Sequence, residues 1–341
     1  MNLKKSLDLI KGKTIAIVYI FEKEEAEGYK HFYVWKNEIL TNWISAIYEL
    51  SCIPYIMDLR TFMYKASNNS LPQIDFVLNL NNGCVDLSTM SLVPSICSFL
   101  HIPCVPCNSI AMLSCENKLI SNNIVRNTHI NVPKDINNHE DSGILRPKAL
   151  GNSIGIKIGS YFNDKGVFQE FIPGYDVTVP FLFNIESQRI EAMPSTIYLP
   201  HSLDPNWIYN EETKFNDLGF TTKNLEIKNE DILNELSEML DVFEVNTFAR
   251  IDARIKSSGK KLSKNINNND ISIDNFYFIE INSMPTIETD DGFDLAFRHV
   301  LESPNNSFYN CAKEYNKYIS NPTVNGFVLL SSILATITSM C

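Results

Sequence analysis

The sequence predicts an α/β fold whose first part holds a parallel sheet and whose central and C-terminal parts are α+β. Three observations carry this prediction. Apolar strand-like runs alternate with helical stripes over the first hundred residues. Strand-like segments dominate the middle of the chain, and two long ones lie close together late in it. The length of 341 residues exceeds what one small core needs and suits two or three subdomains.

The N-terminal part, residues 1–107, is expected to alternate strands with helices. Lys13–Phe21 is a buried-strand run, and Phe32–Leu50 carries apolar residues at helical spacing. Strands connected through helices form parallel sheets. The remaining expected elements are strands at Pro54–Met57, Phe76–Leu80 and Ile102–Val105 and a helix at Leu92–Leu100.

The central part, residues 108–184, is expected to be a compact α+β unit. Ser109–Arg126 reads as one helix. Ile144–Ile158 and Phe168–Phe183 read as strands around a small loop that contains glycine.

The C-terminal part, residues 185–341, begins with a polar stretch, Tyr198–Thr222, of little periodicity. An amphipathic helix over Asn229–Val242 and late closing helices follow. The tail Val324–Cys341 is shorter than the roughly 20 apolar residues of a membrane span, which favours a helix on the core. Two long strands, Asn246–Lys256 and Asn275–Ile281, flank a polar segment, residues 257–272, expected to be an exposed hairpin loop.

Composition and charge narrow the functional classes. Hydrophobic residues make up 44% and charged residues 20%, as in soluble globular proteins. A net charge of -11 without a dense Lys/Arg stripe argues against nucleic acid or a membrane surface as partner. The first residues lack the apolar core and cleavage site of a signal peptide, so we expect a cytoplasmic protein.

The 8 cysteines are scattered and are expected to be reduced thiols, mostly in the core. The one C-x-x-C motif, Cys104 to Cys107, is open to a redox or metal interpretation. The absence of a second Cys/His pair at zinc spacing favours the end of a strand instead.

The two late strands carry the strongest cluster of polar residues. Arg250 and Asp252 are two apart, as are Glu280 and Asn282, so each pair shares one face of its strand. If the strands pair, three oxygen donors converge beside Arg250, a set that suits Mg²⁺, or Mn²⁺. The alternative is a set of salt bridges on a solvated face. The intervening residues expected on the opposite face are Ile251, Ile279 and Ile281.

Two further segments have weaker signals. Residues 146–155 place Gly151 and Gly155 around a polar pair, and such a loop can hold phosphate oxygens with its N–H groups, although many hairpins look similar. Residues 168–179 form a strand, a Pro-Gly turn and an acid, Asp176, which is also consistent with a simple β-turn. Neither a Walker loop nor a dinucleotide fingerprint occurs.

Taken together and in this order, these segments resemble D-alanine–D-alanine ligases and their wider ATP-grasp relatives, over most of the chain after about residue 75. The R-x-D and E-x-N metal signature of the family matches Arg250, Asp252, Glu280 and Asn282. The resemblance implies an ATP-grasp fold in which residues 1–107 are the pre-ATP-grasp domain. Residues 108–184 then form the lid subdomain, and residues 185–341 hold the metal site.

The resemblance also assigns roles at the ATP site. Lys118 and Arg146 correspond to the cations that contact phosphate, and Gln169 stands where the hinge acid pairs with adenine. Asp176 would accept from the ribose hydroxyls. Lys214, in the loop 211–215, would close over the phosphate and join Arg250 as a catalytic cation. Further residues expected to contact ATP are Asn152, Ser153, Glu170 and Ile172.

Several positions depart from the family pattern. Arg146 replaces a lysine of different geometry, Gln169 replaces an acid and Asn152 replaces a serine. Thr286 replaces the glycine whose N–H helps to form the oxyanion hole. Asp291 replaces the serine that binds the carboxylate of the second substrate, and an acid there repels a carboxylate and attracts an amine or guanidinium.

Glu288, Asp290 and Asp291 are therefore candidates for holding a cationic nucleophile. The alternative is an acidic loop that merely faces water.

The implied function is an ATP-dependent ligase that joins an acid to an amine through an acyl-phosphate, with ATP and Mg²⁺ as cofactors. The partners are the small-molecule acid and amine, and the resemblance also implies a homodimer. Three alternatives remain. The chain can be an authentic D-alanine–D-alanine ligase of cell-wall synthesis, a non-catalytic nucleotide-binding scaffold, or an interaction module in which the acids form salt bridges.

Overall fold

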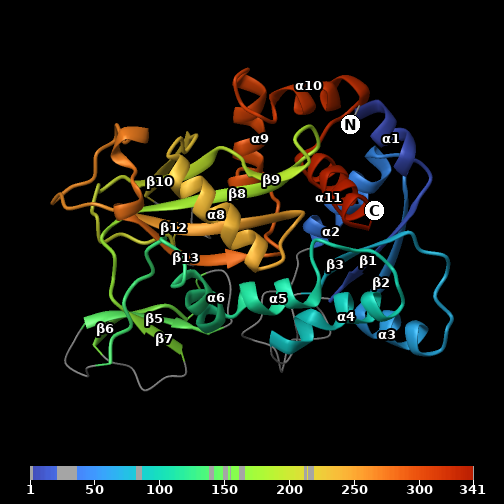
Figure 1. Ribbon diagram of the computed structural model, residues 1–341, viewed down its shortest axis with the longest axis horizontal. Coiled ribbons are helices and arrows are strands. Elements are labelled where there is room, and N and C mark those ends of the chain that lie inside the picture. Colours follow the sequence, from blue (N-terminus) through green and yellow to red (C-terminus); the bar gives the residue numbers. More distant parts are fainter. Residues whose placement is uncertain are drawn as a thin grey trace.

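The computed structural model describes residues 3–20, 37–81, 87–137, 142–148, 153, 155–160, 166–210, 213 and 219–340. Within them lie a four-stranded, a six-stranded and a three-stranded sheet. The six-stranded sheet occupies the middle of the molecule, with the four-stranded sheet to one side and the three-stranded sheet below (Figure 1).

The first sheet is parallel throughout, as the sequence predicts, and has the strand order β2-β1-β3-β4. Alternate residues of its central strand face different cores. Ile15 and Ile17 face the large core, and Ala16 and Val18 face a smaller one with helices α3 and α4. The elements are α1 (Leu3–Ile10), β1 (Thr14–Tyr19), α2 (Asn37–Glu49), β2 (Ile53–Asp58), α3 (Leu59–Ser67), β3 (Phe76–Leu80), α4 (Leu92–Phe99) and β4 (Cys104–Val105).

Two helices of this domain were not predicted, α1 and α3. Helix α3 follows β2 without a loop, because Asp58 ends the strand and caps the helix by accepting from the N–H of Thr61 at 2.9 Å. The beginning of the helix expected from Phe32 lies outside the described residues, which resume at Asn37.

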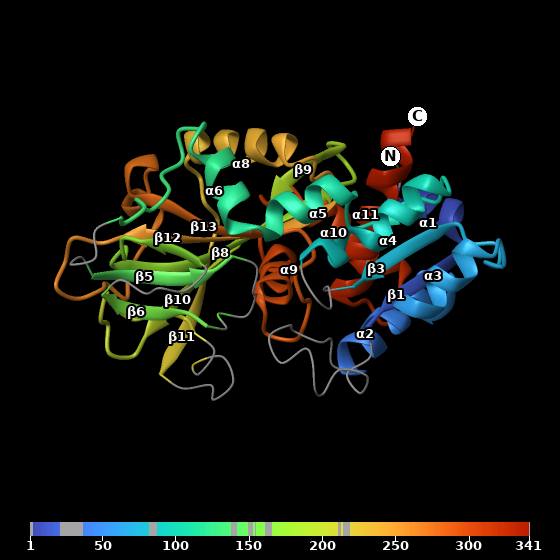
Figure 2. The ribbon, with the colours of Figure 1, turned by 90° about the horizontal axis from the view of Figure 1, so that it is seen from below.

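The single helix expected over Ser109–Arg126 is wrong, because the structure has α5 (Ser109–Glu116) and α6 (Lys118–Val125). Asn117 separates them with an extended backbone (ψ 103°), and its side chain accepts from the N–H groups of Leu119 and Ile120. The two helices run from the first sheet toward the three-stranded one (Figure 2).

The strands expected at Ile144–Ile158 and Phe168–Phe183 each divide in two. β5 (Ser142–Pro147), β6 (Lys157–Ser160) and β7 (Gly166–Gln169) form the antiparallel three-stranded sheet in the order β6-β5-β7. β8 (Gly174–Asn184) belongs to the six-stranded sheet instead, so that sheet begins before the domain boundary expected at residue 184.

The six-stranded sheet has the order β11-β10-β8-β12-β13, with β9 paired to β8, and α8 lies across one of its faces (Figure 1). Strands β10 and β11 form the two ends of the polar stretch that showed little periodicity. The elements of this part of the chain are β9 (Arg189–Ala192), β10 (Ser195–Pro200), β11 (Phe220–Leu225), α8 (Glu230–Val242), β12 (Phe248–Lys256) and β13 (Phe276–Asn282).

The segment between β12 and β13 is not simply an exposed loop. It contains short 3₁₀ turns at Asn268–Asp270 and Ile273–Asn275. Its few apolar side chains, Leu262, Ile266 and Ile271, are buried in the main core. Because the rest of this segment is polar, the sequence pattern did not indicate that these three side chains are buried.

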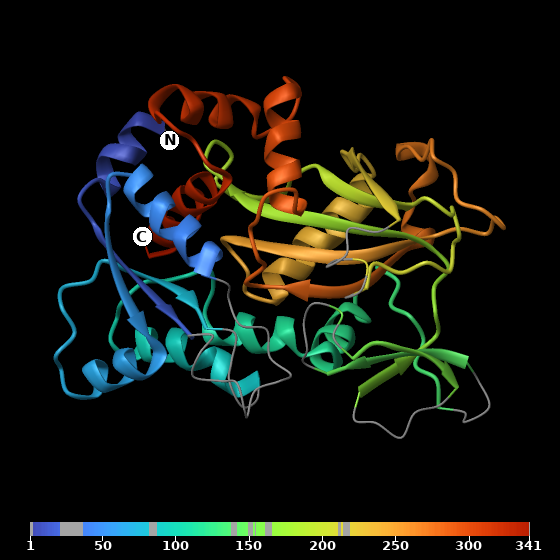
Figure 3. The same cartoon turned by 180° about the vertical axis from the view of Figure 1, so that it is seen from behind.

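Helices α9 (Gly292–Glu302), α10 (Tyr309–Tyr318) and α11 (Val324–Met340) close the chain. Figure 3 shows them gathered beside α2 and the end of β8, and α11 contacts both elements. The tail is therefore the core helix that the sequence predicts. Within the described part of the chain, no helix has the length and apolar character needed to cross a membrane.

Candidate active site

Antiparallel pairing of β12 with β13 brings the predicted metal-binding residues together. Asp252 lies opposite Glu280, and Arg250 lies opposite Asn282, so the expected pairing of the two strands is confirmed. Asp252 accepts from Nδ2 of Asn282 at 3.0 Å and pairs with Nη2 of Arg250 at 2.9 Å. Burial opposes the charge of Arg250, but the Asp252 carboxylate holds the pKa of the guanidinium above its ordinary value.

A bulge in β13 alters the expected alternation. The partner of Asp252 is Glu280 but the partner of Ala253 is Phe278, so Ile279 has no residue opposite it. Ile279 lines the same cavity as Glu280, and its carbonyl oxygen accepts from Nη1 of Arg146 at 2.6 Å. The expectation that Ile279 faces away from the acids is therefore wrong, because the strand does not alternate regularly at that point.

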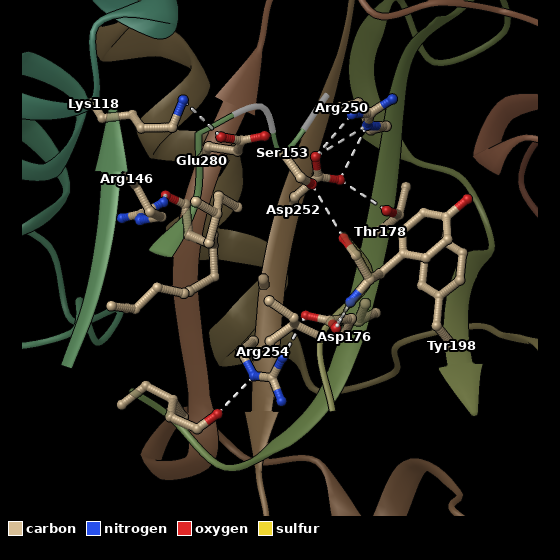
Figure 4. A pocket seen from close by; sticks show the side chains of 18 of the residues that line it. Lys118, Arg146, Ser153, Asp176, Thr178, Tyr198, Arg250, Asp252, Arg254 and Glu280 are labelled. Carbon is tan, nitrogen blue, oxygen red and sulfur yellow. Dashed lines mark hydrogen bonds and ion pairs between the residues drawn. The ribbon is translucent and has the colours of Figure 1, made fainter. Parts of the chain in front are cut away.

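The cavity between the three-stranded and six-stranded sheets has a volume of about 290 Å³ (Figure 4). Most of the predicted site residues line it, whereas Asn282 reaches the cluster through Asp252. The predicted residues Asn152 and Lys214 lie outside the described residues. The predicted residues that line the cavity are Lys118, Arg146, Ser153, Gln169, Glu170, Ile172, Asp176, Arg250, Asp252, Glu280, Thr286, Glu288 and Asp291.

The two predicted phosphate cations are buried on one wall. Nζ of Lys118 is 3.0 Å from Oε2 of Glu280. Arg146 donates Nη2 to Oε1 of Gln169 at 2.6 Å, and burial lowers the pKa of its guanidinium. Both cations therefore stand beside the predicted metal ligands rather than in bulk solvent.

Gln169 is fully buried and its amide is engaged at both ends. Its carbonyl accepts from Arg146, and its Nε2 donates to the carbonyl of Pro133 at 2.9 Å and to Oδ1 of Asp135 at 3.0 Å. An ionised carboxylate could not donate to Asp135, which gives a physical reason for the amide at this position. Pairing of Gln169 with adenine stays a prediction.

Arg254 is a site residue that sequence reasoning missed. It is 4% exposed and donates Nε to the carbonyl of Ile172, Nη2 to the carbonyl of Gly174 and Nη1 to Oδ1 of Asp176, at 2.6, 2.8 and 2.7 Å. Its guanidinium also lies 5.0 Å from the ring centroid of Phe171. The two-residue spacing could have indicated Arg254, because it follows Arg250 and Asp252 on the same face of β12.

Asp176, the predicted ribose acid, is held from two sides. Its second oxygen, Oδ2, accepts from the N–H of Tyr209 at 2.8 Å. The ring of Tyr209 stacks on Tyr198 with centroids 4.2 Å apart, and its carbonyl accepts from Oγ of Ser153 at 3.1 Å. The predicted phosphate loop is thereby connected to Asp176 through Tyr209.

The acids near the N-terminus of α9 have different surroundings. Asp291 caps α9, and burial raises its pKa to about 7. Asp290 forms an ion pair with Arg298 of the same helix. Thr286 and Glu288 line the same cavity as these acids and as Asp252 and Glu280.

Glu116 is a partly buried acid near the site, and sequence reasoning missed it. It accepts from the N–H of Ser283 at 3.2 Å. Burial raises its pKa to about 7, and the charge of Lys118 opposes that rise. Its place two residues before Lys118 was the available signal.

The donor set fits a hard divalent cation. Asp252 and Glu280 are paired across two strands and face one cavity, and oxygen ligands without nitrogen or sulfur suit Mg²⁺. Within the described residues, no group of three or more His, Cys, Asp or Glu side chains gathers for a metal. An ion on two carboxylates would complete its shell with an amide oxygen, water and substrate phosphate, as Mg²⁺ commonly does.

Comparison with known proteins places the fold. No family model matches the chain, and no curated protein matches it in sequence. The D-alanine–D-alanine ligase of Bacillus anthracis in complex with ATP is similar in structure, with a TM-score of 0.62, 15% identity and 96% of this chain and 99% of that chain covered. A D-Ala:D-Ser ligase from Enterococcus faecalis has a TM-score of 0.57 and 14% identity over 89% of this chain and 98% of that chain.

The D-alanyl-alanine synthetase A of Vibrio cholerae is similar to the same degree, with a TM-score of 0.58 and 14% identity over 89% of this chain and 98% of that chain. The chain therefore has an ATP-grasp fold of the D-alanine–D-alanine ligase type, with the parallel N-terminal sheet that the sequence predicts.

Proposed function

We propose that this chain, with its D-alanine–D-alanine ligase-like ATP-grasp fold, is an ATP-dependent ligase that forms an amide between a small acid and an amine. One observation carries the proposal. Asp252 and Glu280 lie in register across β12 and β13 and face one cavity with the buried cations Lys118 and Arg146. Two carboxylates for a metal and two cations for phosphate are the components that ATP-dependent phosphoryl transfer needs.

In this proposal, Lys118 and Arg146 hold the charge of the ATP phosphates, and Asp252 and Glu280 with Asn282 hold Mg²⁺ or Mn²⁺. When bound, the metal supplies charge neutralisation on the phosphate oxygens. The acid substrate takes the γ-phosphoryl group and becomes an acyl-phosphate, and ADP leaves. Lys214 and Asn152 are proposed to contact the ATP phosphates.

The second step joins the amine to the activated carbonyl. The amine nitrogen forms a C–N bond, the C–O bond to phosphate breaks, phosphate leaves with the bonding electron pair, and the ammonium loses a proton. Arg250 and the N–H of Thr286 are proposed to stabilise the oxyanion in between. Arg250 and Asp291 are both partly buried, which limits access of the water that would hydrolyse an acyl-phosphate.

Release of phosphate from Mg-ATP tests the proposal, measured over a panel of acid and amine pairs with mass analysis of the product. We expect release that requires one pair and yields a condensed product. Asp252→Asn should lose this activity, whereas Asp274→Asn, an exposed site outside the cavity, should keep it.

Two results would count against the proposal. Release at the same rate without an amine would indicate a kinase or an ATPase. Tight ATP binding without release for any pair would favour a nucleotide-binding scaffold. Turnover with D-alanine alone as fast as with any pair would leave the ligase activity standing and identify the chain as an authentic D-alanine–D-alanine ligase.

A further inference from the structure

The N-terminus of α9 lies at the edge of the cavity, close to the predicted metal ligand Asp252. A Cβ atom at its first residue, Gly292, would lie 2.7 Å from Cγ2 of Thr178, so only glycine permits this close approach. The hydroxyl of Thr178 donates to Oδ1 of Asp252 at 2.8 Å. The beginning of α9 therefore lies one side chain away from a predicted metal ligand.

The first N–H groups of a helix form a favourable site for an anion, and a substrate carboxylate is such an anion. Here a side chain of the protein already fills that site. Oδ1 of Asp291 accepts from the N–H groups of Phe293 and Asp294 at 2.9 and 3.1 Å, and Oδ2 accepts from the N–H of Glu288 at 2.8 Å. A substrate carboxylate would have to displace a partly buried carboxyl group held by three hydrogen bonds.

Glu288 is the remaining acid at this end of the cavity. Asp290 is neutralised by Arg298, and Arg250 is neutralised by Asp252. The carboxylate of Glu288 makes no hydrogen bond or ion pair with any described residue, and it lines the same cavity as Arg250 and Asp291. A partly buried carboxylate without a partner in a cavity favours a cationic ligand.

We propose that the amine substrate carries a second cationic group and no carboxylate, and that Glu288 pairs with this second cation. Diamines and guanidino-amines are the corresponding chemical classes. The inference rests on the proposed function for the identity of the reaction. It differs from that function in naming the acceptor, since an α-amino acid presents a carboxylate where Asp291 already occupies the helix N–H groups.

Calorimetric titration tests the inference, with the full chain at neutral pH both alone and saturated with Mg²⁺ and a non-hydrolysable ATP analogue. The probes are 1,4-diaminobutane, agmatine, butylamine and D-alanine. We expect the two dications to bind at least about tenfold more tightly than butylamine or D-alanine. Glu288→Gln should remove this preference, whereas Glu302→Gln, an exposed change at the other end of α9, should retain it.

A third variant tests the role of Asp291. Asp291→Ala removes the carboxylate that accepts from the N–H groups of Phe293 and Asp294, so D-alanine should bind more tightly to it than to the unaltered protein. Binding of D-alanine as tight as that of the dications, or a dication preference that survives Glu288→Gln, would overturn the inference while the proposed ligase stands. Failure of the ATP analogue to bind would count against the proposed function, and the titrations without nucleotide would still decide the role of Glu288.

Discussion

Arg254 on β12 lies directly opposite Asp176 on β8, and Nη1 of its guanidinium is 2.7 Å from Oδ1 of the carboxylate. The same guanidinium donates to the carbonyls of Ile172, Gly174, Pro205 and Trp207. One buried side chain thus joins the hinge before β8 to the segment that carries Tyr209. The planar fork of arginine makes this possible, since a lysine has a single nitrogen.

Replacing Arg254 by lysine should therefore destabilise the protein strongly. Several buried carbonyls and the Asp176 carboxylate would lose donors, at a cost of about 3 kcal/mol in the free energy of unfolding. Guanidinium chloride unfolding measures this change. Arg298→Lys is the matched control, because the Arg298 side chain is 51% exposed in its ion pairs, and we expect a loss below about 1 kcal/mol. Equal losses in the two variants would contradict the role of Arg254.

Replacing Gln169 by glutamate restores the residue of the family pattern, yet it should weaken this protein. The new carboxylate would face the carbonyl of Pro133 and the carboxylate of Asp135, both of which now accept from the amide. We expect a loss of roughly 1–3 kcal/mol and weaker binding of Mg-ATP. Adding Asp135→Asn supplies a donor again, so the double variant should lose less than the sum of the single variants in a double-mutant cycle. Strict additivity would show that the two side chains do not interact.

Removing the divalent metal should abolish turnover, and either Mg²⁺ or Mn²⁺ should restore it. Glu280→Gln should reduce turnover by at least about 100-fold at saturating ATP. The change removes one carboxylate from the metal site and removes the ion pair with Lys118. Steady-state kinetics over a range of metal concentrations measures this effect. Undiminished turnover in a chelator would remove the metal from the proposal.

Asp291 predicts a specific dependence of stability on pH. Its pKa is about 7 in the folded chain because of burial, and about 3.9 when unfolded. Because its pKa is raised in the folded state, the contribution of Asp291 to stability is fully present below about pH 4. This contribution is lost as the pH rises to about 7. The stability of the native protein relative to Asp291→Asn should therefore fall over that window by about 4 kcal/mol. A pH-independent difference would show that Asp291 ionises normally.

Glu49 connects the first domain to the closing helices. Its carboxylate accepts from the hydroxyl of Tyr315 on α10. It also accepts, at 3.0 Å, from the N–H of Thr323, which lies just before α11. Burial raises the pKa of Glu49, so each donor matters. Tyr315→Phe should cost about 1–2 kcal/mol in thermal or denaturant unfolding. Tyr318→Phe, which is 42% exposed on the same helix, should cost little, and a similar loss there would argue against the Glu49 contact.

Local pattern was sufficient for most elements that carry the site. The helix α8 begins after Asn229, where an amphipathic pattern starts, and β12 and β13 lie where the paired polar residues were recognised. Pattern was not sufficient at Asn117, where an extended backbone and a side-chain cap divide one periodic stretch into two helices. It also failed at Ile279, because a bulge depends on the neighbouring strand and leaves no mark in one strand alone.

The sequence by itself determined the parallel first sheet, the spacing of Arg250 and Asp252 on one strand, and that of Glu280 and Asn282 on another. These features are local, since they follow from the two-residue repeat of a strand and from apolar periodicity. Only the tertiary structure decided the partners: Arg254 with Asp176, Gln169 with Asp135, and Asp291 with the N–H groups of α9. Which group donates to which depends on register and burial across distant segments, and those arise only when the sheets pack together.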